Sequence, residues 1–191
     1  MNELTDYLKT RRSDLAMTLV EPAPNESEIE TMITLASRVP DHGKLAPWRF
    51  VEYGFEDRKK LAENMGALSD QDADIDRKES RVKEISRFQS APLVIGVIST
   101  ATAHPKVPEW EQVLSAGAAT MQLLIAANAL GYGSQWLTGW YTRDVNVLKL
   151  LGVSGNEQVA GMVHIGTLSA QKTERTRPEL SDIYSRYSPS I

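Results

Sequence analysis

Residues 109–130 read EWEQVLSAGAATMQLLIAANAL, and this stretch decides the fold. Apolar or small residues fill almost every position of its second half, and Gly131 follows as a helix stop. A membrane span needs about 20 predominantly apolar residues, but acidic Glu109 and Glu111 and the many small residues favour a buried helix of a globular protein. We expect a central helix, and its small side chains are compatible with packing against a second copy.

Apolar strands are predicted on both sides of this helix. Residues 93–98 are apolar at every position, which is typical of a strand covered on both faces. Further strands are expected at Trp48–Tyr53, Gly133–Leu137 and residues 158–165. The expected additional helices cover residues 2–10, 25–39, 56–65, 74–88 and 144–151. Because helices alternate with few strands, the layout indicates a layered sandwich of helices and a sheet.

The composition limits the possible functions. The 191 residues, 41% of them hydrophobic, suit a single domain over residues 1–191, and a net charge of -4 gives no reason to expect nucleic acid or an anionic membrane as partner. The chain has no cysteine, so any redox chemistry must come from a cofactor. The first residues, MNELTDYLKTRRS, do not resemble a signal peptide, and we expect a cytoplasmic protein.

The first candidate for binding is Arg11-Arg12-Ser13, at the end of the first expected helix. Two guanidinium groups and a hydroxyl offer several directed donors, which suit a phosphate monoester. Adjacent arginines are more often a solvated surface pair, so that alternative remains open.

The second candidate is the stretch RVPDHGKLAPWRF at residues 38–50. It places Arg38, His42 and Lys44 in a loop made rigid by prolines, directly before an aromatic strand. This arrangement indicates a rim for an anionic, planar ligand. In the alternative interpretation His42 is a turn residue hydrogen-bonded to its neighbours.

The third candidate is GYGSQWLTGW at residues 131–140. Its glycines allow close approach of the backbone to a ligand, and backbone amides together with Thr138 can hydrogen-bond the edge of a heterocycle. A glycine-rich turn with core tryptophans explains the stretch equally well.

Several other classes of site are not supported. The chain has no G-x-G-x-x-G fingerprint, no P-loop and no G-x-S-x-G element. The three histidines are scattered, and His164 lies in an apolar strand pattern that predicts a core role. We therefore expect neither a metal site nor a catalytic side chain.

Taken in order, these stretches resemble the FMN-dependent nitroreductase superfamily, in particular its compact YdjA-like branch. The motifs are R-R-S near the start, P-x6-P-W-x-F, W-E-Q-x-x-S-A-G-A-A opening the long helix, and the G-Y-G turn. The resemblance implies an α+β fold, a nitroreductase-like three-layer α/β sandwich with a central mixed sheet. It also implies a homodimer with FMN bound at the subunit interface.

The resemblance assigns roles to individual residues. It implies that Arg11, Arg12 and Ser13 hold the flavin phosphate and ribityl chain, and that a tail arginine, Arg175 or Arg177, completes the phosphate site. It further implies that the partner subunit contributes Arg38 and His42. The isoalloxazine would be lined by three successive residues, Trp136, Leu137 and Thr138. Lys44 and Ala46 stand where many relatives have Asn and Gln, a difference that concerns the substrate pocket.

The activity implied is an NAD(P)H-dependent, FMN-containing oxidoreductase. Hydride would pass from NADH or NADPH to flavin N5 and then to a nitroaromatic, quinone or similar electron-poor acceptor, in a ping-pong sequence. Arg38 and Lys44 are candidates to stabilise negative charge on the flavin. Two alternatives remain: a flavin-binding or flavin-handling protein of this fold without nitroreductase turnover, and an interaction protein whose basic residues are only surface.

Overall fold

The structure is a computed structural model that describes residues 3–170 and 174–188. The chain divides into two compact units. We call Ser13–Ala170 the core unit, and Met1–Arg12 together with Gln171–Ile191 the terminal unit. Each is described by itself, and the single domain over residues 1–191 stays a prediction.

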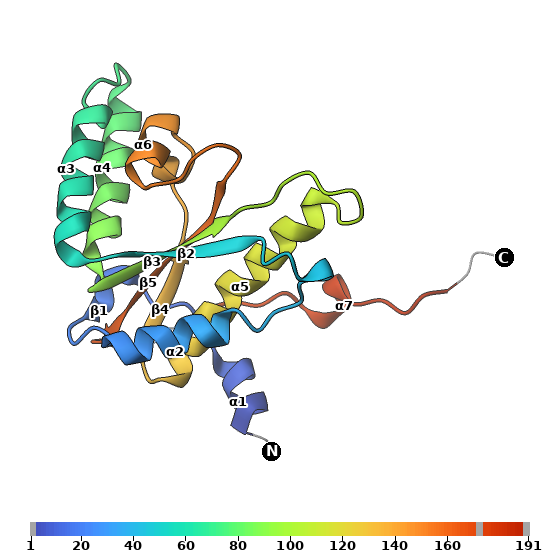
Figure 1. Cartoon of the computed structure of the whole chain (residues 1–191). Helices are drawn as coiled ribbons and strands as arrows, with labels where there is room; N and C mark the ends of the chain where they lie inside the picture. Colours follow the sequence, from blue (N-terminus) through green and yellow to red (C-terminus); the bar gives the residue numbers. More distant parts are fainter. Residues whose placement is uncertain (1–2, 171–173, 189–191) are drawn as a thin grey trace. The chain divides into compact units, whose positions relative to one another are not determined.

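The core unit contains every helix and strand expected within it (Figure 1). Helix α3 extends beyond its expected bounds at both ends, and one short strand, β1, and three 3-10 turns were not predicted. In chain order the elements are η1 Ala16–Thr18, β1 Leu19–Val20, α2 Glu26–Ala36, η2 His42–Lys44, β2 Trp48–Tyr53, α3 Phe55–Ser69, α4 Ile75–Ser90, β3 Leu93–Ser99, α5 Glu109–Ala129, β4 Gly133–Leu137, η3 Trp140–Thr142, α6 Val145–Leu150 and β5 Gln158–Leu168.

Strand β5 is the centre of the sheet. It is hydrogen-bonded along both edges, since His164 lies opposite Val94 of β3 and also opposite Gln135 of β4. Strand β2 continues the sheet beyond β3, and β1 pairs with the last residues of β5.

The expected mixed sheet is wrong, because all strand pairs among the described residues are antiparallel. The reason lies in the crossover. Helix α5 connects β3 to β4, and these two strands run in the same direction because each is antiparallel to β5. Strand β5 lies between them, so the crossover produces no parallel pair. The remaining expectation, an α+β fold with helices on both faces of a sheet, is confirmed.

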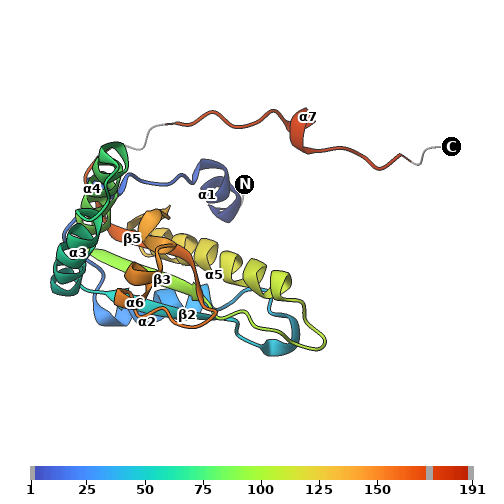
Figure 2. The same ribbon diagram turned by 90° about the horizontal axis from the view of Figure 1, so that it is seen from above.

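Two hydrophobic clusters lie on opposite faces of the sheet (Figures 1 and 2). Leu93, Ile95 and Val97 of β3 pack with α2 and α5, whereas Val94 and Ile98 pack with α3, α4 and α6. Every residue of β3 is buried. Burial on both faces is the physical reason for an apolar residue at successive positions.

His164 has the core role that the sequence predicted. Its ring lies in the second cluster's layer, with its centroid 6.5 Å from that of Phe88. Burial lowers the pKa of His164 to about 4, so the imidazole is neutral at pH 7.

Arg58 is a second buried polar residue, and it ties three elements together. Its guanidinium donates to the carbonyl of Tyr53 at 3.0 Å, to that of Phe88 at 3.2 Å and to that of Pro92 at 2.6 Å. One guanidinium therefore joins the end of β2, the end of α4 and the residue before β3. Burial lowers the pKa of Arg58.

The terminal unit contains α1 Glu3–Thr10 and α7 Leu180–Ile183. The predicted first helix is confirmed from residue 3 onward, and Asn2 lies outside the described residues. The short α7 was not predicted. No helix in the described parts of the chain combines the length and apolar character needed to cross a bilayer.

Replacing Arg58 tests its structural role. We expect Arg58→Ala to lower the free energy of unfolding by about 3 kcal/mol, because buried carbonyl groups lose a charged donor. Urea denaturation measures the change.

The matched control is Arg77→Ala, which removes an exposed ion pair to Asp74, the N-cap of α4. We expect this change to cost less than about 0.5 kcal/mol. Equal losses for the two variants would contradict the role given to Arg58.

Candidate functional site

The segment that follows Arg12 is bound to β4. The backbone N–H of Asp14 donates to the carbonyl of Ser134 at 3.0 Å, and the Asp14 carboxylate accepts from the Ser134 N–H at 2.9 Å. The Ala16 N–H donates to the side chain of Gln135 at 2.6 Å. Ser13, next to Asp14, is thereby held beside the third candidate stretch.

Gly133 makes this close approach possible. A Cβ at this position would lie 2.6 Å from a methyl carbon of Leu19 and 3.1 Å from an oxygen of Asp14, so a larger residue would displace both. Asp14 is buried at 3% exposure. The sequence interpretation missed it, although its place directly after R-R-S was an available signal.

The indole of Trp136 packs against the backbone of β5. A Cβ at Gly161 would overlap the indole ring, and the indole N–H donates to the carbonyl of Ala160 at 3.2 Å. Ala160 is at an irregularity of the sheet, where the register of β5 against β3 shifts. Trp136 is 36% exposed as a residue, so it presents a partly open aromatic side chain near the end of β4.

The turn after Thr138 is held by α4. The Glu84 carboxylate accepts the N–H of Trp140 at 2.7 Å, and the guanidinium of Arg81 lies 4.5 Å from the centroid of the Trp140 ring. The hydroxyl of Thr142 donates to the carbonyl of Gly139 at 2.7 Å. No local signal in the sequence connects Glu84 with a turn 56 residues away.

The second candidate stretch forms a tight loop around Asp41. Its carboxylate accepts the N–H of Leu45 at 3.0 Å and that of Ala46 at 2.9 Å. The loop includes two non-glycine residues with positive φ, Lys44 at 57° and Ala46 at 45°. Each costs about 1 kcal/mol, which the Asp41 contacts help to offset.

The first turns of α5 hold the same loop. The Nδ1 atom of His42 lies 2.7 Å from a carboxylate oxygen of Glu111, and the Ser115 hydroxyl donates to the carbonyl of Pro40 at 2.5 Å. The Gln112 side chain donates to the carbonyl of Val107 at 3.1 Å. Glu111 and Ser115 of the W-E-Q-x-x-S motif therefore anchor the loop, whereas Gln112 holds the segment before α5. Sequence reasoning did not find this role for Glu111.

Among the described core residues, the cations of this loop have no polar contact with the end of β4. The side chains of Arg38 and Lys44 are exposed and make no hydrogen bond or ion pair with described residues of the core unit. No hydrogen bond or ion pair joins Arg38, His42 or Lys44 to residues 136–138 among the described residues of this unit. Contribution of the loop to another subunit's site stays a prediction.

The terminal unit gathers the remaining predicted basic residues. Arg12 forms an ion pair with Glu174, and the second oxygen of Glu174 accepts the backbone N–H of Arg175 at 2.9 Å. Arg177 donates to the carbonyl of Arg175 at 3.1 Å. The Arg175 N–H, and then the charges of Arg12 and Arg177, lower the pKa of Glu174. Arg11 precedes Arg12 at the end of α1.

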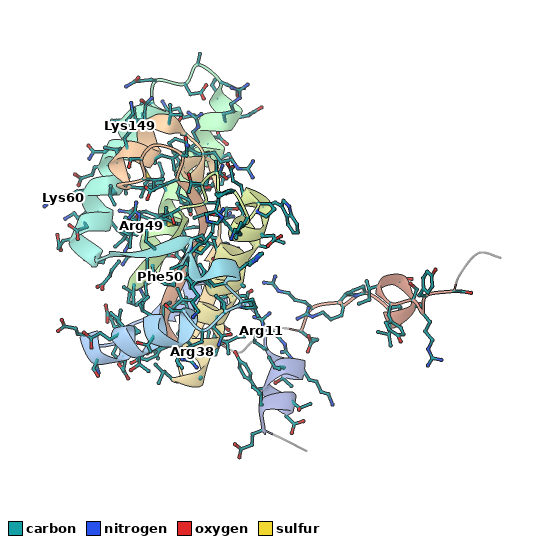
Figure 3. All side chains as sticks on the ribbon, turned by 45° about the vertical axis from the view of Figure 1, so that its right-hand side comes forward. Arg11, Arg38, Arg49, Phe50, Lys60 and Lys149 are labelled. Carbon is teal, nitrogen blue, oxygen red and sulfur yellow. The ribbon has the colours of Figure 1, made fainter. Side chains whose placement is uncertain are left out.

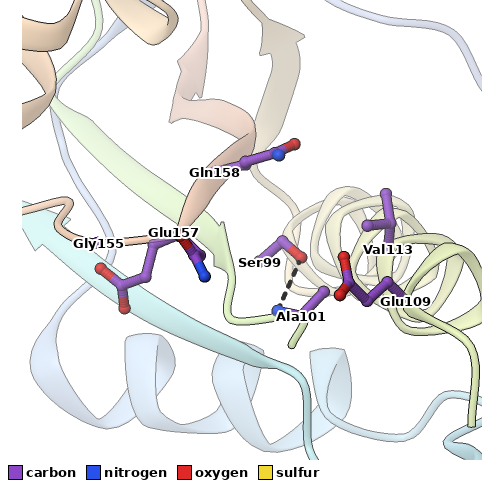
Figure 4. A pocket seen from close by; sticks show the side chains of 8 residues that line it. Ser99, Ala101, Glu109, Val113, Gly155, Glu157 and Gln158 are labelled. Carbon is purple, nitrogen blue, oxygen red and sulfur yellow. Dashed lines mark hydrogen bonds between the residues drawn. The ribbon is translucent and has the colours of Figure 1, made fainter. Parts of the chain in front are cut away.

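Three of the pockets in the core unit lie at the ends of β3 and β4. The one in Figure 4, of about 380 Å³, lies between the end of β3, the start of α5 and the loop before β5, and contains none of the predicted site residues. A second, of about 210 Å³, is lined by Leu137, and a third, of about 570 Å³, by Thr138. The end of β4 therefore borders two separate pockets.

Glu157 lines two of these pockets, but its charge is matched by Arg49 (labelled in Figure 3). Nε and Nη2 of Arg49 donate to its two oxygens at 2.7 and 2.8 Å, and the Ser154 N–H adds a bond at 3.0 Å. The hydrogen bonds from Arg49 lower the pKa of Glu157 to about 2.

Comparison with known proteins identifies the family. The sequence model of the Nitroreductase family matches residues 8–167. The chain belongs to this family. A Haemophilus influenzae protein, assigned by inference as an NAD(P)H nitroreductase, is 36% identical over 177 residues and 92% of each chain. The Escherichia coli K12 protein YdjA, assigned in the same way, is 33% identical over 85% of this chain and 86% of its own.

A solved structure agrees with the fold. The FMN-bound nitroreductase of Bacteroides fragilis superimposes with a TM-score of 0.76 at 21% identity, over 98% of this chain and all of the other. The expected nitroreductase resemblance and fold are thus confirmed. The roles of the individual site residues stay predictions.

The Arg49–Glu157 pair predicts a specific pH dependence of stability. The pKa of Glu157 in the folded chain, about 2, lies below the ordinary value of 4.5, so between these values the unfolded state binds more protons. We expect the pair's stabilisation, about 1 kcal/mol because Arg49 is partly exposed to solvent, to be present above pH 4.5 and to disappear toward pH 2.

Urea unfolding of the wild type and of Glu157→Gln between pH 3 and pH 7 measures this difference. The gap between the two proteins should narrow as the pH falls. A gap that is constant across the range would rule out the ion pair as its source.

Proposed function

We propose that this protein is an NAD(P)H-dependent oxidoreductase that uses FMN to reduce nitroaromatic compounds, quinones or similar electron-poor acceptors. The observation that carries the proposal is the match to a protein assigned as an NAD(P)H nitroreductase at 36% identity over 92% of both chains. The FMN bound to the Bacteroides fragilis nitroreductase supports the choice of cofactor.

The chemistry of the residues present fits FMN. A phosphate monoester requires directed cationic donors, and Arg11, Arg12, Arg175 and Arg177 belong to one unit, with Ser13 next in the chain. A flat ring system requires a flat, partly open surface, which Trp136 provides against Gly161. We assign the four arginines and Ser13 to the phosphate and ribityl chain, and residues 136–138 to the ring.

When bound, FMN would supply the ring that accepts hydride from NADH or NADPH and passes two electrons to the acceptor. The protein's own contribution is to bind, orient and provide charge. Exposed Arg38 and Lys44, which have no partner among described core residues, are suited to stabilise negative charge on a bound ligand. This division of labour requires no nucleophile or general base from the chain.

We also infer a homodimer in which the second copy contributes Arg38 and His42 to each site. Support comes from α5, which leaves three apolar side chains exposed near its start: Trp110 at 63%, Val113 at 42% and Leu114 at 62%. They recur at helical spacing on one side of the helix. Exposed apolar clusters of this kind mark association surfaces, and α5 also holds the loop that carries His42.

A spectroscopic experiment tests the function. Purified protein loaded with FMN should be yellow, lose its visible absorption on anaerobic addition of NADH or NADPH, and regain it when a nitroarene is added. A flavin-binding protein without turnover would stay yellow with either donor. Protein that remains colourless after incubation with FMN would contradict the proposal.

The dimer is tested with Leu114→Arg. We expect this variant to be monomeric by light scattering, because a charge replaces an apolar contact, and to lose about 1.5–3 kcal/mol of FMN binding free energy, since charged contacts from the partner are lost. Fluorescence titration measures the affinity.

Val82→Arg is the matched control, because Val82 is also an exposed aliphatic residue within a helix, at 56% exposure. It should leave both assembly and FMN affinity unchanged. A monomeric Leu114→Arg protein that keeps full FMN affinity would refute the shared site.

A further inference from the structure

The pocket of about 570 Å³ lies at an open edge of the central strand. Strand β4 ends at Leu137, opposite Met162, so the first residues of β5, from Gln158 to Gly161, have no β4 partner on that edge. The pocket occupies this position. Its lining comes from the β4–α6 connection, from α6 and from the start of β5: Thr138, Thr142, Arg143, Leu148 and residues 157–160.

The charges around this pocket are unbalanced. Glu157 already accepts three hydrogen bonds from Arg49 and Ser154. The guanidinium of Arg143 makes no hydrogen bond or ion pair with any described residue of the core unit, and Arg143 is exposed. A positive charge without a partner therefore borders the pocket, beside apolar Leu148 and Val159.

The pocket adjoins the segment assigned to the flavin ring. Thr138 belongs to both, and Ala160, another lining residue, accepts the indole N–H of Trp136. The turn that connects Thr138 with Arg143 is fixed by Glu84 and by the Thr142 hydroxyl. Arg143 is thus held at the end of a short rigid connection from the ring-binding segment.

We propose that this pocket is the subsite for the electron acceptor and that Arg143 selects aromatic acceptors carrying a carboxylate. This inference rests on the proposed function and specifies its substrate class. A volume of about 570 Å³ suits a small aromatic molecule. A guanidinium binds a carboxylate through two parallel hydrogen bonds, while Leu148 and Val159 offer contacts to the ring.

A second anionic group suits the same guanidinium, namely the 2′-phosphate of NADPH. The volume favours the acceptor, because a whole dinucleotide is larger than a drug-sized ligand pocket of this kind. Comparing NADPH with NADH separates the two sources, since only NADPH carries the additional phosphate.

Arg143→Gln is the test variant, and 4-nitrobenzoate and its neutral analogue 4-nitrobenzamide are the probes. We expect KM for 4-nitrobenzoate to rise about tenfold, the usual effect of a lost charge-assisted hydrogen bond. The kcat values and KM for 4-nitrobenzamide should not change. Arg143→Lys should restore part of the preference. Lys60→Gln is the control, because it removes an exposed charge from α3 (Figure 3) and should alter neither KM.

An unchanged KM for 4-nitrobenzoate, or an equal rise for both probes, would overturn the proposal. A rise in KM for NADPH but not for NADH, with 4-nitrobenzoate unaffected, would assign Arg143 to the donor and also overturn it.

Turnover of 4-nitrobenzamide shows separately whether the proposed function holds. If the wild type reduces neither probe, calorimetric titration of 4-nitrobenzoate into the FMN-loaded wild type and the Arg143→Gln protein tests the subsite alone. About tenfold weaker binding to the variant supports the subsite, and equal or absent binding refutes it.

Discussion

The hydrogen bonding of β5 along both of its edges is the constraint on which the rest of the core unit depends. Because β3 occupies one edge and β4 the other, the crossover through α5 must span the central strand. That path places α5 across the sheet, where its first turns hold the loop of Asp41 and His42. The early end of β4 leaves the edge of β5 open at the pocket that contains Arg143. Fold and candidate site thus follow from one pairing arrangement.

Close contact between side chains and backbone then sets the geometry around β4. Gly133 admits Asp14 and Leu19, and Gly161 admits the indole of Trp136. These contacts fix both ends of a five-residue strand that β5 holds along one edge. A planar cofactor requires an aromatic contact and close approach of the backbone. Around β4, both arise where residues from distant parts of the sequence pack against glycine.

The sequence predicted the elements whose cause is local. Helix α2, which begins at the capping box of Asn25 and Glu28, and strand β3, which is buried on both faces, both have causes within a few residues, and both elements were predicted. Strand β1 is two residues long and leaves no periodicity to detect. The order in which strands pair also leaves no local trace in the sequence. The sheet was therefore wrongly expected to be mixed. Contacts such as Asp14 with Ser134, 120 residues apart, depend on the completed fold.

The arginines of the core unit show the same limit of sequence analysis. Their partners in the folded chain distinguish them. Nothing local in the sequence distinguishes Arg49, Arg58 and Arg143, and none of them was predicted to bind a ligand. In the folded core, Arg49 is matched by Glu157 and Arg58 by backbone carbonyl groups, so neither charge is available to a ligand. Arg143 has no such partner among the described core residues and borders a pocket. The charges of Arg49 and Arg58 are already compensated by partners within the chain. The charge of Arg143 is not, so it can gain a strong ion pair only with a group from outside the chain. Within the core unit, this difference separates Arg49 and Arg58 from Arg143.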